Sequence, residues 1–134
     1  MTAGLLLDTN ALLLLSFQPE DVPPRHLEAF EATDRFVSQI CAIEIAIKFS
    51  LGKLPLSPNF RMDFSSAFNQ IVSDLSADLL PIDLKHIDRL SRLPLFHRDP
   101  FDRLIIAQAL EHDLTVMTRD RAFAAYPGLS LVQI

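Results

Sequence analysis

Glu44 lies at a position where a glutamate is unexpected. The segment Ile40–Leu51 (ICAIEIAIKFSL) reads as a helix whose apolar side chains recur at spacings of three and four, which gives one stripe of Ile40, Ile43, Ile47 and Leu51. Glu44 falls inside this stripe. A carboxylate left alone on a buried face costs several kcal/mol, so it must be neutral, paired or bound to a cation. Glu44 is therefore a candidate metal ligand, and an ion pair with Lys48 is the structural alternative.

Three aspartates are also placed at the start or end of apolar segments, namely Asp8, Asp102 and Asp120. In parallel sheets, ligand sites form beyond the carboxyl ends of the strands, so acids at strand ends and helix starts can meet although they are far apart in sequence. Carboxylate oxygens suit Mg²⁺, with Mn²⁺ as a substitute, and no cysteine–histidine spacing argues for zinc. The four acids therefore predict a metal-dependent enzyme.

Each aspartate also has a purely structural interpretation. Asp8 begins an Asp-Thr-Asn sequence that could cap a helix or form a turn. Asp99 could be the N-cap of a helix that Pro100 begins, with Asp102 three residues after the cap. Asp120 could cap the short helix that follows it. The glutamate is harder to explain in this way, because capping is not available inside a helix.

The expected elements alternate between strands and helices along the chain. Short apolar runs bounded by turn residues predict strands at Gly4–Asp8, Arg35–Ser38, Leu79–Ile82, Leu114–Met117 and Leu129–Val132. Helical spacing predicts helices at Ala11–Ser16 (capped by Thr9 or Asn10), His26–Ala32, Ile40–Leu51, Phe60–Leu75, Asp83–Leu90, Phe101–Glu111 and Arg121–Ala125. This alternation predicts an α/β fold, with a parallel sheet and helices on both of its faces.

Composition places the chain among globular proteins of ordinary size. It has 134 residues, of which 49% are hydrophobic and 22% charged, so it can bury a core and is not disordered. The apolar runs are too short for a membrane span, no basic segment precedes them as in a secretory signal, and the single Cys41 excludes an internal disulfide, so we expect a cytoplasmic protein. The net charge of −5 argues against coating nucleic acid by bulk electrostatics, although bound metal would reverse the local sign.

Four segments match a known family pattern in order and in spacing. They are LLLDTNALL (Leu5–Leu13), SQICAIEIAIKFSLGKL (Ser38–Leu54), HRDPFDRLIIAQAL (His97–Leu110) and TVMTRD (Thr115–Asp120). Together they resemble the PIN-domain ribonucleases, and most closely the VapC-type toxins of bacterial toxin–antitoxin pairs. The resemblance implies a single PIN-like domain over residues 1–134, a three-layer α/β/α sandwich with a central, mostly parallel sheet of about five strands.

The resemblance also implies catalytic and metal-binding roles for four acids, which fall on Asp8, Glu44, Asp102 and Asp120. One or two Mg²⁺ ions held by these carboxylates would lower the pKa of a bound water, which would hydrolyse RNA to a 3′-hydroxyl and a 5′-phosphate. Asp99 matches an additional acid of the subgroup that carries an HRDPFDR segment. That acid would support the site or be structural.

Other polar residues near these acids are candidates for supporting roles or substrate contacts: Asn10, Lys48, Arg98, Asp99 and Thr118. Thr118 and Asn10 could orient a metal-bound water, whereas Lys48 could steer RNA towards the acids. His97 and Arg98 could contact a phosphate, although exposed loop residues usually have no such role. The chain also departs from the subgroup pattern, because Asn10 replaces a frequent histidine and leucines at 14 and 15 replace frequent aromatic residues. These departures affect substrate contacts at most.

The resemblance further implies partners. They are an RNA substrate, a VapB-like antitoxin that blocks the site and itself binds DNA, a second copy of the chain in a homodimer, and a larger toxin–antitoxin assembly. A membrane is not among them. Ile45 and Phe49 lie away from the apolar stripe, so the Ile40–Leu51 helix is apolar nearly all round. Such a helix is either deeply buried or used at the homodimer or antitoxin contact.

Two other interpretations compete with the nuclease. A receiver-type signalling domain also binds Mg²⁺ on a parallel sheet, but it needs two adjacent acids after the first strand and a late lysine. Asp8 has no acidic neighbour, and no lysine follows Lys85. A PIN-like domain without activity could serve only as a binding module, but all four acids are present in this chain.

Overall fold

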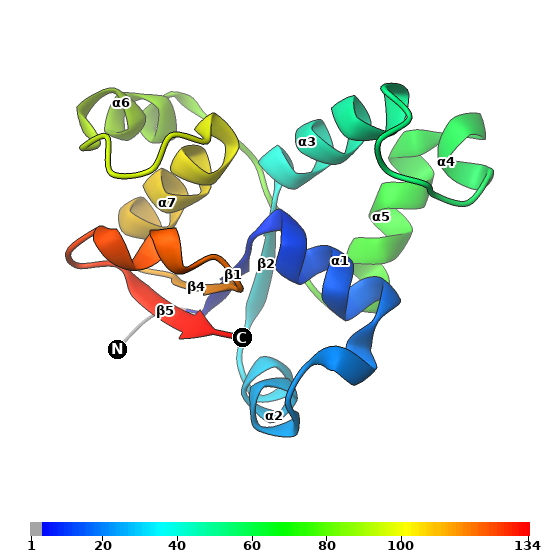
Figure 1. Cartoon of the computed structure of the whole chain (residues 1–134), viewed down its shortest axis with the longest axis horizontal. Coiled ribbons are helices and arrows are strands. Elements are labelled where there is room, and N and C mark those ends of the chain that lie inside the picture. Colours follow the sequence, from blue (N-terminus) through cyan, green and yellow to red (C-terminus); the bar gives the residue numbers. More distant parts are fainter. Residues whose placement is uncertain (1–3) are drawn as a thin grey trace.

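A five-stranded, wholly parallel sheet forms the centre of the computed structural model, which describes residues 4–134 (Figure 1). Its strands are β1 (Leu5–Leu7), β2 (Arg35–Ser38), β3 (Asp78–Leu80), β4 (Thr115–Thr118) and β5 (Ser130–Gln133). The order across the sheet is β3-β2-β1-β4-β5. Strand β1 is central and all three of its leucines are buried, as expected for a strand covered on both faces.

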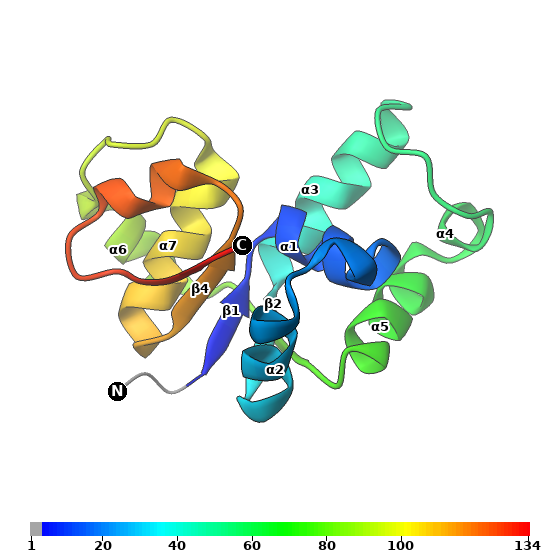
Figure 2. The same ribbon diagram turned by 60° about the horizontal axis from the view of Figure 1, so that its bottom comes forward.

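Helices cover both faces of this sheet. They are α1 (Thr9–Phe17), α2 (Pro24–Ala32), α3 (Gln39–Ser50), α4 (Asn59–Met62), α5 (Phe64–Asp74), α6 (Leu84–Arg92) and α7 (Pro100–His112), with short 3₁₀ helices η1 (Pro19–Asp21) and η2 (Arg121–Ala125). Figure 2 shows α6 and α7 on one side of the strands and α1, α2 and α5 on the other. The predicted α/β/α architecture is therefore confirmed. None of the helices in residues 4–134 is long and apolar enough to span a membrane.

The strand order reverses beside β1. The chain passes from β1 to β2 on one side, and later returns to place β4 on the other side of β1. Ligand sites of open parallel sheets form at such a switch point, beyond the carboxyl ends of the strands. Helix α3 follows β2 directly and packs against both α1 and α7. The carboxyl ends of β1 and β4 and the starts of α1, α3 and α7 therefore surround one region.

Three local expectations were wrong. Helix α1 is capped by Asp8 rather than by Thr9 or Asn10, because the Asp8 carboxylate accepts a hydrogen bond from the backbone N–H of Ala11. The expected helix over residues 60–75 is divided at Asp63, whose side chain caps α5 instead. The segment Arg121–Ala125 forms a 3₁₀ helix rather than an α-helix.

The apolar stripe expected on α3 is also not the buried face. Ile43, Ile47 and Leu51 are 43%, 44% and 62% exposed, respectively. The buried residues of α3 are Ile40, Cys41, Glu44 and Ile45. Because α3 lies between α1 and α7, the face that carries Glu44 points towards the switch point. Glu44 and Ile40 are thus buried as expected, but the other buried residues of α3 are Cys41 and Ile45 rather than members of the expected stripe.

Candidate metal and active site

Asp8 lies at the end of β1 and is held by two hydrogen bonds. One carboxylate oxygen accepts from the backbone N–H of Ala11 at 2.8 Å, and the other accepts from the Thr118 hydroxyl at 2.5 Å. The Thr118 oxygen in turn accepts from the backbone N–H of Asp120 at 2.9 Å. Thr118 therefore links the end of β1 to the turn after β4.

Asp102 and Asp120 meet at the imidazole of His97. The His97 Nε2 atom lies 2.9 Å from Asp102 Oδ2 and 3.0 Å from Asp120 Oδ2. Asp102 is placed in the first turn of α7, whose N-cap is Asp99. Asp120 is the N-cap of η2 and accepts from the backbone N–H of Ala122. Capping of η2 therefore fixes the position of Asp120. The Asp99 cap fixes the start of α7 and with it the position of Asp102.

Glu44 makes two short hydrogen bonds. Its Oε1 accepts from the Thr9 hydroxyl at 2.6 Å, and its Oε2 lies 2.6 Å from the Lys48 ammonium. The ion pair with Lys48 that the sequence suggested as an alternative is thus present. It does not take Glu44 away from the other acids, because Thr9 follows Asp8 directly and Lys48 also interacts with the charges of Asp99 and Asp102. The bond to Glu44, followed by its charge, raises the pKa of Lys48.

Burial and mutual repulsion perturb two of these carboxyl groups. Burial raises the pKa of Asp8 to about 6, and the charges of Asp120 and Glu44 contribute in the same direction. The hydrogen bonds from Thr118 and Ala11 lower this pKa but do not cancel the effect of burial. Burial also raises the pKa of Asp102 to about 7, and the charges of Asp99, Asp8 and Glu44 add to this shift. A bound cation would stabilise the ionised form of both carboxyl groups, so their raised pKa values are consistent with a metal site.

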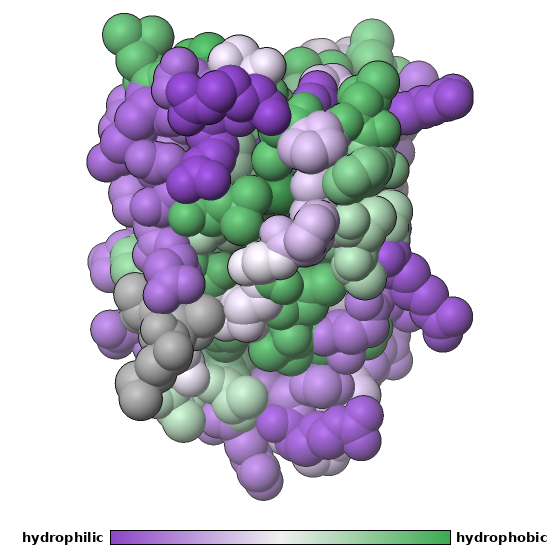
Figure 3. Space-filling model, turned by 90° about the vertical axis from the view of Figure 1, so that its left-hand side faces the viewer, coloured by the Kyte–Doolittle hydropathy of each residue, from purple (hydrophilic) through white to green (hydrophobic). Residues whose placement is uncertain are grey.

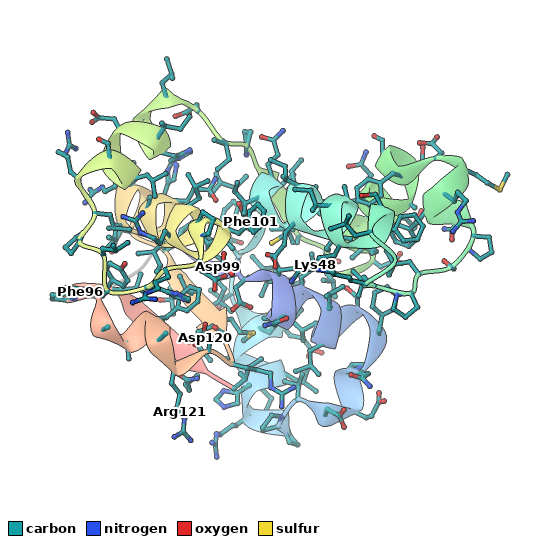
Figure 4. All side chains as sticks on the ribbon, turned by 45° about the horizontal axis from the view of Figure 1, so that its top comes forward. Lys48, Phe96, Asp99, Phe101, Asp120 and Arg121 are labelled. Atoms are coloured by element: carbon teal, nitrogen blue, oxygen red, sulfur yellow. The ribbon has the colours of Figure 1, made fainter. Side chains whose placement is uncertain are left out.

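The remaining candidate residues are placed differently from one another. The Asp99 carboxylate accepts from the backbone N–H groups of Phe101 and Asp102, at 2.8 and 3.3 Å. Figure 4 shows Asp99, Asp120 and Lys48 around one central region, while Arg121 points away from it. Thr118 is buried within the site, whereas Asn10 and Arg98 are exposed at its margin. We therefore assign Asp99 and Thr118 to the interior of the site by position.

The donor atoms fit a divalent cation, although they are not all equally close. Within residues 4–134, His97, Asp102 and Asp120 offer ligand atoms that lie within 4.8 Å of one another. Asp8 and Glu44 are not part of this tight group, and each of their four carboxylate oxygens accepts a hydrogen bond from another group. Carboxylate oxygens are the ligands that Mg²⁺ and Mn²⁺ prefer. The set as a whole is therefore a suitable cation site.

Two participants were not predicted from the sequence. Thr9 was considered only as a helix cap, and His97 only as a phosphate contact. The contact of Thr9 could have been anticipated, because a hydroxyl next to a buried acid is itself buried and needs a hydrogen-bond partner. For His97 the only signal is its place in the HRDPFD segment, five residues before Asp102.

A groove of about 670 Å³ opens beside the acids. Its walls come from one side of α1, from the segment after α3 and from the turn after β4, with lining residues Asn10, Leu13, Leu14, Phe17, Gln18, Leu54, Pro55, Leu56 and Arg119. Most of these side chains are apolar, and Arg119 is the only charged one. Asn10 and Arg119 are close in sequence to Asp8 and Asp120, so one end of the groove adjoins the acids.

Comparison with known proteins gives one family and several related folds. The family described as PIN domain matches residues 5–129. No curated protein matches the sequence significantly.

Among solved structures, the chain resembles one from VapBC2 of Rickettsia felis bound to a DNA fragment from their promoter, with 18% identity, a TM-score of 0.69, and 96% and 97% of the two chains covered. DNA-bound VapBC from Salmonella typhimurium gives 20% identity, a TM-score of 0.66, and 97% of each chain covered. FitAcB from Neisseria gonorrhoeae gives 20% identity, a TM-score of 0.64, and 96% of each chain covered. At these identities the solved structures establish a shared fold.

Proposed function

Because the chain belongs to the PIN-domain family, whose members are generally nucleases, we propose that it is a metal-dependent endoribonuclease. We further propose that it is the VapC-like toxin of a toxin–antitoxin pair and acts in the cytoplasm. The resemblance of its fold to chains of VapBC and FitAcB complexes supports this role. The proposed catalytic and metal-binding residues are Asp8, Glu44, Asp102 and Asp120.

The observation that carries the proposal is that acids from separate segments are connected at the carboxyl end of the sheet through hydrogen-bonded side chains, a backbone N–H and chain neighbours. Asp8 is linked through Thr118 to Asp120, and Asp120 is linked through His97 to Asp102. Glu44 joins through Thr9, the neighbour of Asp8. A protein gains no stability from gathering like charges in a partly buried region. A cation that all of them bind explains the arrangement.

Each part of the chain then has a distinct task. A divalent ion at these acids would lower the pKa of a coordinated water and neutralise charge that develops on the scissile phosphate. Asp8 and Asp120 are held in place by backbone N–H groups, so they need little rearrangement when the ion binds. Lys48 can turn away from Glu44 into solvent, because its side chain is 46% exposed. Arg98 and Arg119 are exposed at the margin and could bind flanking phosphates.

An apolar surface beside the site could contact RNA bases. Leu95 and Phe96 are exposed in the loop between α6 and α7, directly before His97. Figure 3 shows this side of the molecule, where hydrophobic residues form a band between polar regions. Aromatic side chains bind single-stranded nucleic acid by stacking on its bases. We therefore propose that Phe96, which lies at the outer edge of the molecule (Figure 4) and packs against Tyr126, stacks on an unpaired base of the RNA away from the cleaved bond.

The proposed protein partners have suitable surfaces elsewhere. The groove along α1 is apolar and adjoins the acids, so an antitoxin segment could fill it and place a basic side chain among the carboxylates. The exposed Ile43, Ile47 and Leu51 form a separate apolar surface on α3. This surface suits a second copy of the chain, because isologous contacts bury the same patch on both subunits.

The nuclease proposal is tested by RNA cleavage with purified protein. We expect cleavage that requires Mg²⁺ or Mn²⁺ and that Asp8→Asn lowers at least about a hundredfold, because removal of one charge-stabilising group costs about 10² to 10³ in rate. The folded state of the variant is checked by circular dichroism. Asp88→Asn is the matched control, since Asp88 is exposed on α6 and pairs only with Arg92.

Unchanged cleavage by Asp8→Asn, or full activity in excess EDTA, would contradict the proposed chemistry. No cleavage by the wild-type protein with any divalent metal would instead favour a PIN-like binding module.

A further inference from the structure

His97 occupies the space between two of the proposed metal ligands. Its Nε2 atom lies 2.9 Å from Asp102 Oδ2 and 3.0 Å from Asp120 Oδ2, and the side chain is only 13% exposed. A single ring nitrogen therefore contacts both carboxylates at hydrogen-bond distance. The imidazole either coordinates the ion together with these acids or stands in the place that the ion takes.

The other ring nitrogen decides between these two roles. His97 Nδ1 accepts a hydrogen bond from the backbone N–H of Asp99 at 3.3 Å. An accepting Nδ1 carries no proton, so the ring proton is on Nε2 and points at the carboxylates. A histidine that binds a metal does the reverse, because it coordinates through one nitrogen and donates the N–H of the other to an acceptor. His97 thus has the tautomer of a donor rather than that of a ligand.

The position of His97 is also built by its surroundings. The Tyr126 hydroxyl accepts from the backbone N–H of His97 at 3.0 Å and donates to the carbonyl of Pro94 at 2.7 Å. The imidazole packs nearly perpendicular to the ring of Phe123 in η2, with 5.7 Å between the ring centroids. Both aromatic residues follow Asp120 in the chain. The segment that follows Asp120 therefore holds His97 in place, and His97 in turn bridges Asp120 and Asp102.

Lys48 provides a contrast within the same site. It contacts Glu44 from a side chain that is 46% exposed, and within residues 4–134 no ring or hydroxyl holds it in place. An ion can replace it by rotation of a flexible side chain into water. His97 can be replaced only if its loop contacts change as well.

We propose that His97 is a stand-in for the cation: it holds Asp102 and Asp120 together in the metal-free protein and is displaced when a divalent ion binds. The inference rests on the proposed function, because it assumes that these acids bind metal. It makes His97 a positioning residue that keeps the empty site assembled and competes with the ion. Removal of His97 should therefore strengthen metal binding, whereas removal of a ligand would weaken it.

The test is titration of the metal-free protein with Mn²⁺ and with Mg²⁺ by isothermal titration calorimetry. We expect His97→Ala to lower the dissociation constant about tenfold, because the ion no longer displaces a charge-assisted hydrogen-bond donor. His112→Ala is the matched control, since it removes a histidine that contacts His86, far from the acids in the α6–α7 packing. Its dissociation constant should equal that of the wild type.

Weaker or unchanged binding in His97→Ala would overturn the inference and leave the nuclease proposal intact. Absence of binding in both proteins would overturn the metal site, and with it the proposed function.

A second measurement uses the unaltered protein and does not depend on the folding of a variant. Nitrogen-15 NMR of the His97 ring should show a proton on Nε2 without metal, and the same tautomer with its hydrogen bonds lost at saturating Mg²⁺. A proton on Nδ1 in the Mg²⁺-saturated protein would identify His97 as a ligand and overturn the inference.

Discussion

The two halves of the acidic site solve the same electrostatic problem in different ways. The β4 half consists of Asp8, Asp102, Asp120 and His97, which bridges the last two acids, and the α3 half consists of Glu44 and Lys48. In the β4 half, fixed donors hold the carboxylates while burial still raises the pKa of Asp8 and Asp102. In the α3 half, a flexible cation neutralises the charge. The comparison indicates that fixed contacts hold the carboxylates of the first half, so an ion must displace a held side chain there, whereas in the second half it displaces only a mobile one.

The largest expected difference between the halves is in the pH dependence of stability. The pKa of Asp8 is raised from 3.8 to about 6 in the folded protein, so its contribution to stability is full below pH 4 and is lost as the pH rises through about 6. This change amounts to about 3 kcal/mol. Between pH 4 and pH 7 we expect the free energy of unfolding of metal-free Asp8→Asn to increase relative to wild type by about that amount.

Urea denaturation at a series of pH values in EDTA measures this difference. Glu44→Gln is the comparison variant, because it removes an acid from the other half of the site. An equal pH-dependent increase in the free energy of unfolding of both variants would show that the two halves are not distinct. No gain in Asp8→Asn would show that Asp8 is not under electrostatic strain.

A smaller effect is expected for Glu44→Gln at neutral pH. Its partner Lys48 is half-exposed, and such ion pairs contribute only about 0 to 1 kcal/mol. A glutamine can still accept from Thr9, and it lowers the repulsion with Asp8 and Asp102. The free energy of unfolding without metal should therefore stay within about 1 kcal/mol of wild type, or rise.

Thermal and urea unfolding of the metal-free variant check this expectation. A loss well beyond that range would mean that the ion pair is a structural element, and that the two halves differ less than proposed.

The fold could be predicted because buried parallel strands leave a simple pattern. Leu5–Leu7 is wholly apolar and is followed by a polar cap, and β1 is indeed buried at the centre of the sheet. The break at Asp63 was missed because Phe60, Phe64 and Phe68 continue the helical spacing across it. Their rings pack in sequence from α4 into α5, so the apolar pattern reports the packing and not the cap.

The buried face of α3 could not be predicted from periodicity alone. The helix carries apolar residues nearly all round, so several stripes fit equally well, and the contacts with α1 and α7 decide among them. Glu44 was singled out from the wrong stripe, although it is buried on the correct face for the site. The role of His97 was out of reach for a related reason. Its contact with Asp120 spans 23 residues and depends on the loop that Tyr126 holds, which no local pattern encodes.

Anomalous diffraction from crystals soaked in Mn²⁺ shows directly whether these acids bind one or two catalytic cations. We expect a strong peak with oxygens of Asp102 and Asp120 in the first coordination sphere of the ion, and with Asp8 or Glu44 bound directly or through water. The peak should be lost on replacement of Mn²⁺ by buffer with EDTA. A saturating soak that gives no peak at these carboxylates, or a peak only elsewhere on the protein, would contradict the proposed metal site.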